Sequence, residues 1–190
     1  ACEHYSGLVQ KEHFPNFIQF RRDLLRLKEL IRDIGVIRIL GGEPLLNNEI
    51  EKYIKLTRKI YPVSDIYVVT NGLLLRKMPD TFFETIKANN IHIWISFYLP
   101  LESKMEGILQ FLSSKGVSVM LSPLNRTFTK KQRLVAQDFH QTEKVFWNCY
   151  QHSCNNLYEG KLAACFLPFT TKYFNQYFHK ALPEDGAIDL

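Results

Sequence analysis

The stretch Val36-Ile37-Arg38-Ile39-Leu40-Gly41-Gly42-Glu43-Pro44 joins a short apolar strand to a polar loop, and the pattern recurs along the chain. Its β-branched residues favour a strand, and the glycine pair that follows favours a turn. Three further strands are expected over residues 66–70, 91–98 and 117–121. The four strands begin 25 to 30 residues apart, which is a typical spacing for repeated strand–helix units.

Amphipathic segments separate these strands. The first helix is expected over residues 14–34, where apolar side chains recur at alternating steps of three and four. Further helices are expected from Asn47 or Asn48 to Tyr61, from Asp80 to about Asn90, and over residues 101–115. Strands that alternate with helices predict an α/β fold with a parallel sheet. An open doubly wound sheet and a partial or full βα barrel both satisfy this pattern.

The composition narrows the class of protein. With 190 residues and 46% hydrophobic content, the chain is long enough for one domain, or for one domain with a small appendage. It contains no run of 18 apolar residues and no signal peptide, so we expect no membrane partner. The net charge of +5 is spread along the chain, which argues against nucleic acid as a partner. Four cysteines without a secretory signal indicate reduced thiols and a cytoplasmic protein.

Small polar residues follow each expected strand. Glu43 lies in the first loop, Thr70-Asn71-Gly72 ends the second strand, Ser96 lies on the third and Ser122 follows the fourth. Ligands of parallel sheets bind at the carboxyl ends of the strands. The glycine pair allows a ligand to approach the backbone, and the Glu43 carboxylate can pair with an amine. The pattern suits a zwitterionic ligand that carries a ribose.

Taken together, Gly41-Gly42-Glu43-Pro44, Thr70-Asn71-Gly72 and Ile95-Ser96 resemble the radical S-adenosylmethionine superfamily. Its members carry a C-x3-C-x2-C triplet that binds three irons of a [4Fe–4S] cluster, and Cys2 lies where the third cysteine would fall. The resemblance covers about residues 1–124 and implies a partial (βα)6-type TIM barrel that lacks its first strand. Within the superfamily, the similarity extends to members whose tail holds Gly-Lys-Leu and then Cys, here Gly160-Lys161-Leu162 and Cys165.

The resemblance also implies roles for individual residues. Cys2 would be a ligand of the [4Fe–4S] cluster, and the Gly41-Gly42-Glu43-Pro44 segment would receive the amino group of S-adenosylmethionine. Thr70, Asn71 and Ser96 would lie along its nucleoside and carboxylate. The implied activity is that of an iron–sulfur oxidoreductase that cleaves S-adenosylmethionine reductively. The resulting 5′-deoxyadenosyl radical abstracts hydrogen from a substrate that the sequence does not identify. Such an enzyme needs an electron donor of the flavodoxin or ferredoxin type.

The chain departs from the family at the cluster. A cluster of this type needs about three protein thiolates, and only Cys2 is present at this site. We therefore expect a fragment of a longer enzyme, inactive as it stands. The alternative is a non-catalytic binding protein of the same fold, either cluster-free or stabilised by zinc. A conventional nucleotide-binding enzyme is a weaker candidate, because neither G-x-G-x-x-G nor G-x4-G-K-[ST] occurs.

Residues 125–190 are expected to form a small C-terminal module that contains three cysteines. Cys149, Cys154 and Cys165 lie within 17 residues, across a hairpin that the Glu159-Gly160 pair predicts. Three interpretations stay open: an auxiliary iron–sulfur cluster, a zinc site with His152 as the fourth ligand, or three buried thiols. The segment over residues 125–147 is expected to be irregular, with one or two helical turns at best, and a final helix is expected over residues 169–182.

Overall fold

The computed structural model describes residues 4–11, 13–127, 138–149 and 152–190. The chain divides into two compact units: residues 24–127 form one, and residues 1–23 together with 128–190 form the other. We refer to them as the sheet unit and the terminal unit. Helix α1 (Phe17–Leu30) contributes its first half to the terminal unit and its second half to the sheet unit.

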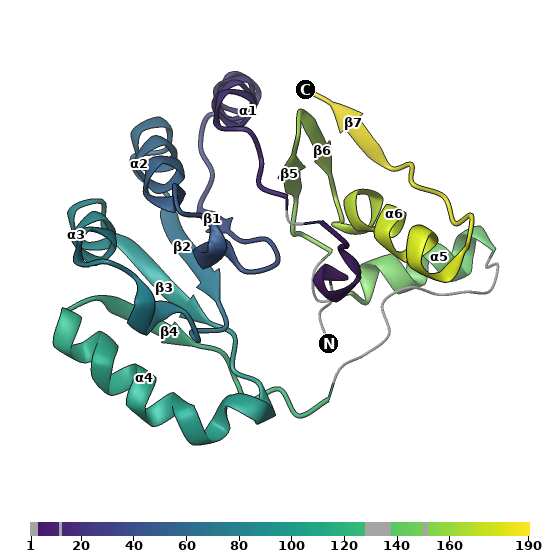
Figure 1. The fold of residues 1–190 in the computed structure, drawn as a ribbon. Helices are drawn as coiled ribbons and strands as arrows, with labels where there is room; N and C mark the ends of the chain where they lie inside the picture. Colours follow the sequence, from purple (N-terminus) through teal and green to yellow (C-terminus); the bar gives the residue numbers. More distant parts are fainter. Residues whose placement is uncertain (1–3, 12, 128–137, 150–151) are drawn as a thin grey trace. The chain divides into compact units, whose positions relative to one another are not determined.

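The sheet unit contains four parallel strands in the order of the sequence, β1-β2-β3-β4. Figure 1 shows helices α2, α3 and α4 on one side of these strands. The elements are β1 (Val36–Ile39), η2 (Pro44–Leu46), α2 (Ile50–Ile60), β2 (Asp65–Thr70), η3 (Leu75–Lys77), α3 (Asp80–Ala88), β3 (Ile91–Ile95), η4 (Leu99–Leu101), α4 (Glu102–Lys115) and β4 (Ser118–Leu121). The predicted α/β fold with a parallel sheet is confirmed.

The core of the sheet unit lies between the strands and these three helices. Alternate residues of β2 and β3 face it, among them Ile66, Val68, Ile93 and Ile95, each with essentially no exposed surface. The period of two along each strand sends these side chains to one face. They pack against apolar residues of the three helices, among them Ile54, Phe82 and Leu112. This packing holds the carboxyl ends of the strands at one edge of the sheet.

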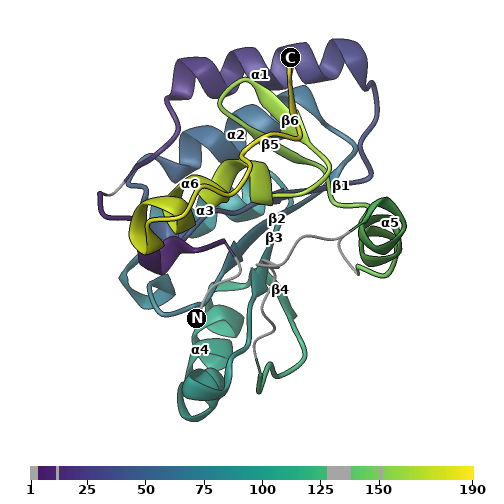
Figure 2. The same ribbon diagram turned by 90° about the vertical axis from the view of Figure 1, so that its right-hand side faces the viewer.

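The terminal unit contains a small antiparallel sheet, β5-β6-β7. Helix α6 lies beside it in both views (Figure 1 and Figure 2). Its elements are η1 (Ser6–Leu8), α5 (Phe139–Trp147), β5 (Asn156–Tyr158), β6 (Lys161–Ala163), α6 (Leu167–Phe178) and β7 (Ala187–Asp189). The predicted hairpin is confirmed: Glu159 and Gly160 join β5 to β6, with φ of 46° and 79°.

Several expected boundaries are wrong. The first helix covers Phe17–Leu30 and not residues 14–34, and the final helix covers Leu167–Phe178 and not residues 169–182. The helical spacing of apolar residues continues into loop residues that are not helical, so the spacing does not mark the ends of a helix. None of Asn47, Asn48 and Asp80 is the N-cap of these helices: Glu49 and Pro79 hold the N-cap positions of α2 and α3. The segment that was expected to be irregular contains α5, whose N-cap Asp138 accepts a hydrogen bond from the Gln141 amide at 2.8 Å.

Candidate functional site at the carboxyl edge of the sheet

The loop after β1 leaves room for a ligand at Gly41. Gly41 and Gly42 are exposed, and a Cβ atom built at Gly41 would meet nothing within 4 Å. Pro44 is buried and starts the short helix η2, for which Glu43 is the N-cap. The loop therefore combines an open glycine backbone with a firmly packed proline.

The Glu43 carboxylate is held by three hydrogen-bond donors. The hydroxyl of Thr70, at the end of β2, donates to Oε1 at 2.7 Å, and the Asn71 amide donates to Oε2 at 3.1 Å. The Leu45 amide also donates to Oε1, at 3.2 Å. Thr70 is 2% exposed, so its bond to the carboxylate is shielded from water. We call this arrangement the Glu43 clamp; it joins the loop after β1 to the loop after β2.

The ends of β3 and β4 are tied to the same edge. The Ser96 amide donates to the Thr70 carbonyl at 2.8 Å, and the Ser122 amide donates to the Ile95 carbonyl at 3.0 Å. The Ser122 hydroxyl accepts from the Phe97 amide at 2.9 Å. The predicted strand-end residues therefore lie along one edge of a single sheet.

Gly72 shapes the turn after β2. Its φ of 84° lies in the left-handed region, where a residue with a side chain is strained. Its amide donates to the Thr70 hydroxyl at 3.0 Å, so Thr70 both accepts from this turn and donates to Glu43. The turn orients the hydroxyl toward the clamp.

The clamp can still receive a ligand amine. An ionised carboxylate offers about four acceptor positions, and three donors occupy Glu43. Counting donors from the described residues alone, one acceptor position of the carboxylate is not used. The sequence predicted that Glu43 binds a ligand amine, but it did not predict the protein donors that hold its carboxylate. The one local signal was that a loop glutamate can cap a short helix, as Glu43 does for η2.

The predicted cysteine sites are not assembled in the part of the chain that the structure describes. Cys2 lies outside the described residues. Cys149, Cys154 and Cys165 are half-buried, and the Cys149 carbonyl accepts from the His152 amide. Among the described residues, no group of three or more His, Cys, Asp or Glu side chains could hold a metal ion. The metal site at these cysteines therefore stays a prediction.

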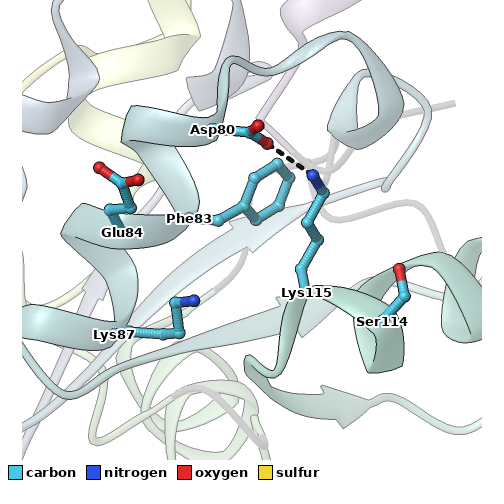
Figure 3. Close-up of a pocket in the computed structure, with 6 residues that line it drawn as sticks. All are labelled: Asp80, Phe83, Glu84, Lys87, Ser114 and Lys115. Atoms are coloured by element: carbon cyan, nitrogen blue, oxygen red, sulfur yellow. Dashed lines mark hydrogen bonds and ion pairs between the residues drawn. The ribbon is translucent and has the colours of Figure 1, made fainter.

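A surface hollow lies between α3 and α4 (Figure 3). It is lined by Asp80, Phe83, Glu84, Lys87, Ser114 and Lys115. The Lys115 ammonium pairs with Asp80 and lies over the Phe83 ring. Its hydrogen bond and its charge lower the pKa of the Asp80 carboxyl. These contacts join the two helices, and none of the predicted site residues lines the hollow.

The terminal unit also contains a buried carboxylate, Asp23, that the sequence did not predict. Asp23 is 5% exposed and accepts hydrogen bonds from the Gln19 side chain at 2.6 Å and from the Gly160 amide at 2.8 Å. It therefore holds the hairpin turn against α1. Asp23 lies among the polar positions of the helical pattern, where the sequence gives no indication that a side chain is buried or has a distant partner.

Comparisons with known proteins support the resemblance over parts of the chain. No family model matches. Among the described residues, no helix has both the length and the apolar character needed to cross a membrane. The chain is 43% identical over 58 residues to a GTP 3′,8-cyclase of Clostridium acetobutylicum, which covers 30% of this chain and 18% of the relative. A relative of the same name from Clostridium botulinum is 37% identical over 79 residues, covering 40% and 24%. A third, from Alkaliphilus oremlandii, is 33% identical over 101 residues, covering 48% and 29%. The chain thus spans less than a third of the length of these relatives, and over the matched stretches it is similar to GTP 3′,8-cyclases.

Proposed function

We propose that the chain is part of a radical S-adenosylmethionine enzyme, with β1 to β4 forming part of a βα barrel. The observation that carries the proposal is the Glu43 clamp, which joins the Gly-Gly-Glu-Pro loop to Thr70 and Asn71 at the carboxyl edge of the sheet. The GTP 3′,8-cyclases to which the chain is similar are radical S-adenosylmethionine enzymes, which supports the same assignment.

The carboxyl edge fits the methionine end of S-adenosylmethionine. Gly41 allows close approach to the backbone, and the remaining acceptor position of Glu43 suits the amine. Thr70 and the clamp keep the loop in place without help from the ligand. Asn71 and Ser96 lie beside Thr70, where they can contact the nucleoside or the carboxylate.

S-adenosylmethionine bound to a reduced [4Fe–4S] cluster would supply a 5′-deoxyadenosyl radical that abstracts hydrogen from a substrate. In this proposal Cys2 is one ligand of the cluster, and a flavodoxin or ferredoxin supplies the electron. The residues of the carboxyl edge bind and orient the cofactor and keep water away from it. Cys149, Cys154 and Cys165, with or without His152, would form a separate metal site.

Gly41→Ala tests the proposal, with Gly35→Ala as the matched control. Both glycines are exposed, and at both a Cβ atom would meet nothing within 4 Å. Neither change should therefore lower the thermal stability. The added methyl group at Gly41 would enter the space proposed for the cofactor, whereas the methyl group at Gly35 would lie before β1.

The measurements are equilibrium dialysis of S-adenosylmethionine and release of 5′-deoxyadenosine after reduction, both on full-length protein reconstituted anaerobically. We expect Gly41→Ala to weaken binding about tenfold or more, the effect of roughly 1.4 kcal/mol. Gly35→Ala should match the unmodified protein. Equal binding by both variants, or no 5′-deoxyadenosine from the unmodified protein, would overturn the proposal.

A further inference from the structure

The turn after β2 contains the one Asn-Gly pair of the sequence, Asn71-Gly72. Asparagine is a thermolabile residue, and the residue that follows it strongly affects how fast it deamidates. The backbone nitrogen of that next residue attacks the asparagine side chain, and glycine hinders the attack least because it has no Cβ atom. In an unfolded chain, Asn71 should therefore deamidate faster than the other asparagines.

The reaction is an intramolecular substitution at the side-chain amide. The Gly72 nitrogen loses its proton to a base and forms a bond to Cγ of Asn71. The bond from Cγ to Nδ2 breaks, and ammonia leaves with a proton from the solvent. Water then opens the cyclic imide at one of its two carbonyl carbons, which gives aspartate or isoaspartate. Water is the one co-reactant, and no oxidant or reductant takes part.

The structure withdraws the attacking nitrogen from solvent. Gly72 is buried, and a Cβ atom built on it would lie 3.6 Å from side-chain atoms of Ile95 and Ile108. Its amide donates a hydrogen bond to the Thr70 hydroxyl at 3.0 Å. That hydroxyl in turn donates to Glu43 at 2.7 Å, so the amide proton is linked through Thr70 to the Glu43 clamp. A base can reach this proton only when the turn opens.

The asparagine itself is held by two further hydrogen bonds. Oδ1 of Asn71 accepts from the Leu73 amide at 2.9 Å, and the Asn71 amide donates to Oε2 of Glu43 at 3.1 Å. A change of side-chain rotamer at Asn71 breaks the first bond, and a shift of its backbone breaks the second. The turn and the clamp therefore fix both partners of the reaction.

We propose that Asn71 is a deamidation site that the Glu43 clamp protects, and that opening of the clamp converts Asn71 to aspartate and isoaspartate. The new carboxylate would belong to a residue that donates to Glu43, so two negative charges would repel each other there. Isoaspartate also adds a backbone atom before Gly72, which displaces the buried turn. The modification thus disrupts the clamp that prevented it. This inference goes beyond the proposed function and depends on neither S-adenosylmethionine nor a cluster.

The test is incubation of the protein at mildly alkaline pH, with deamidation of Asn71 followed by mass spectrometry of its peptide. Labelling by an isoaspartate methyltransferase identifies the isoaspartate product. The folded protein is compared with the protein in guanidinium chloride, and exposed Asn48, which precedes Glu49, is the internal reference. Hydrogen exchange of the Gly72 amide is measured in parallel, because the same opening exposes its proton to base.

Two substitutions at Thr70 separate the hydrogen bond from the shape of the side chain. Thr70→Val removes the acceptor of the Gly72 amide, and Thr70→Ser keeps it. Thr127→Val, at an exposed position, is the matched control. Asn71→Gln identifies the signal, since its longer side chain closes a less favourable ring and should give much less product. Circular dichroism shows which variants are folded at the start.

We expect Asn71 to deamidate about tenfold or more faster in guanidinium chloride than in the folded protein, and to outpace Asn48 only when unfolded. Folded Thr70→Val should deamidate about fivefold faster than the unmodified protein, with a parallel rise in exchange of the Gly72 amide. Thr70→Ser and Thr127→Val should resemble the unmodified protein.

Equal rates in the folded and the unfolded protein would overturn the proposal, as would a folded Thr70→Val that deamidates at the unmodified rate. If Thr70→Val does not fold, the unmodified protein in low concentrations of guanidinium chloride decides. There the deamidation rate of Asn71 should rise in proportion to exchange of the Gly72 amide. A deamidation rate that does not follow this exchange would contradict protection by the turn. Loss of S-adenosylmethionine binding or of 5′-deoxyadenosine release has no bearing on these rates, so the proposed function fails or stands separately.

Discussion

The Thr70 hydroxyl donates a 2.7 Å hydrogen bond to Glu43, and this bond joins the end of β2 to the loop after β1, across 27 positions of the sequence. Because Thr70 is buried at the end of β2, the hydrogen bond anchors the loop after β1 to the packed sheet. The glutamate thus has a structural partner before any ligand arrives. Its carboxylate is oriented in advance, which lowers the ordering cost of binding.

Removing this hydroxyl should loosen the loop. Thr70→Val keeps the shape of the side chain but leaves a carboxylate oxygen with one donor fewer. Since hydrogen bonds to charged groups contribute about 1.5–3 kcal/mol, we expect the free energy of unfolding to fall by about 2 kcal/mol in urea denaturation. Thr70→Ser, which keeps the hydroxyl, should lose less than half as much. Thr127→Val at an exposed position should be neutral, and a neutral Thr70→Val would contradict the clamp.

Arg58 should be a major stabilising residue of the sheet unit. Its guanidinium donates to carbonyl oxygens that follow α2 and α3, namely those of Tyr61, Pro62, Ser64, Asn89 and Asn90. A lysine ammonium is a compact donor and cannot reach both loops at once. Arg58→Lys should therefore lower the free energy of unfolding measured in urea by about 2 kcal/mol if two or three bonds are lost. Lys59→Gln, exposed on the same helix, should change it little.

Glu51 should make the stability depend on pH. Burial alone would raise the pKa of this carboxyl, but hydrogen bonds from Thr85 and Thr81 and the charge of Lys55 outweigh burial and lower it below the ordinary 4.5. A lowered pKa in the folded state stabilises the protein above pH 4.5, and this contribution is lost as the pH falls through the folded value.

We therefore expect Glu51→Gln to be less stable than the unmodified chain at pH 7, with the difference shrinking as the pH falls below 4.5. Thermal unfolding at a series of pH values measures this difference. Glu29→Gln, at an exposed site on α1, is the control for the loss of a glutamate. A difference that stays constant down to the acid transition would contradict the role of Glu51.

Asp23 should hold the hairpin of the terminal unit. Asp23→Ala leaves the Gly160 amide and the Gln19 side chain without this acceptor, at a cost of about 1–3 kcal/mol for a buried group. Hydrogen exchange at Gly160 should accelerate, because its amide loses the Asp23 bond. Asp33→Ala, at an exposed position, should leave this exchange rate unchanged. An unaltered Gly160 amide in Asp23→Ala would show that another acceptor replaces it.

The C-terminal cysteines give a prediction that metal analysis can decide. If they bind metal together, Cys149→Ser, Cys154→Ser and Cys165→Ser should each lower the metal content of anaerobically purified protein. Iron with sulfide would indicate an auxiliary cluster. Zinc that is also lost in His152→Gln, but not in the control His140→Gln, would indicate a Cys₃His site. A metal content that none of the serine variants changes would exclude both.

The sequence predicted the sheet unit well where the signal is local. The observed β1 and α4 each differ from the expected segment by one residue. Their apolar side chains recur with the period of a strand or of a helix, and this period can be recognised within a short stretch of sequence. Gly116 ends α4 in the left-handed conformation, with φ of 63°, as a glycine at that position predicts. Helix caps were predicted less well: Asn47 or Asn48 was expected to cap α2, but Glu49 does, because the start of the helix depends on how the preceding loop packs.

By itself, then, the sequence determined the parallel strand–helix units and the polar residues at the ends of the strands. Both follow from the periodicity of side chains along a helix or a strand. Only the tertiary structure decided that Glu43 is held by Thr70, that Asp23 holds Gly160, and that Arg38 stacks on Trp94. These partners lie 27, 137 and 56 residues apart in the chain. No local pattern encodes such pairs, because they form only when the folded chain brings residues that are distant in the sequence within contact distance.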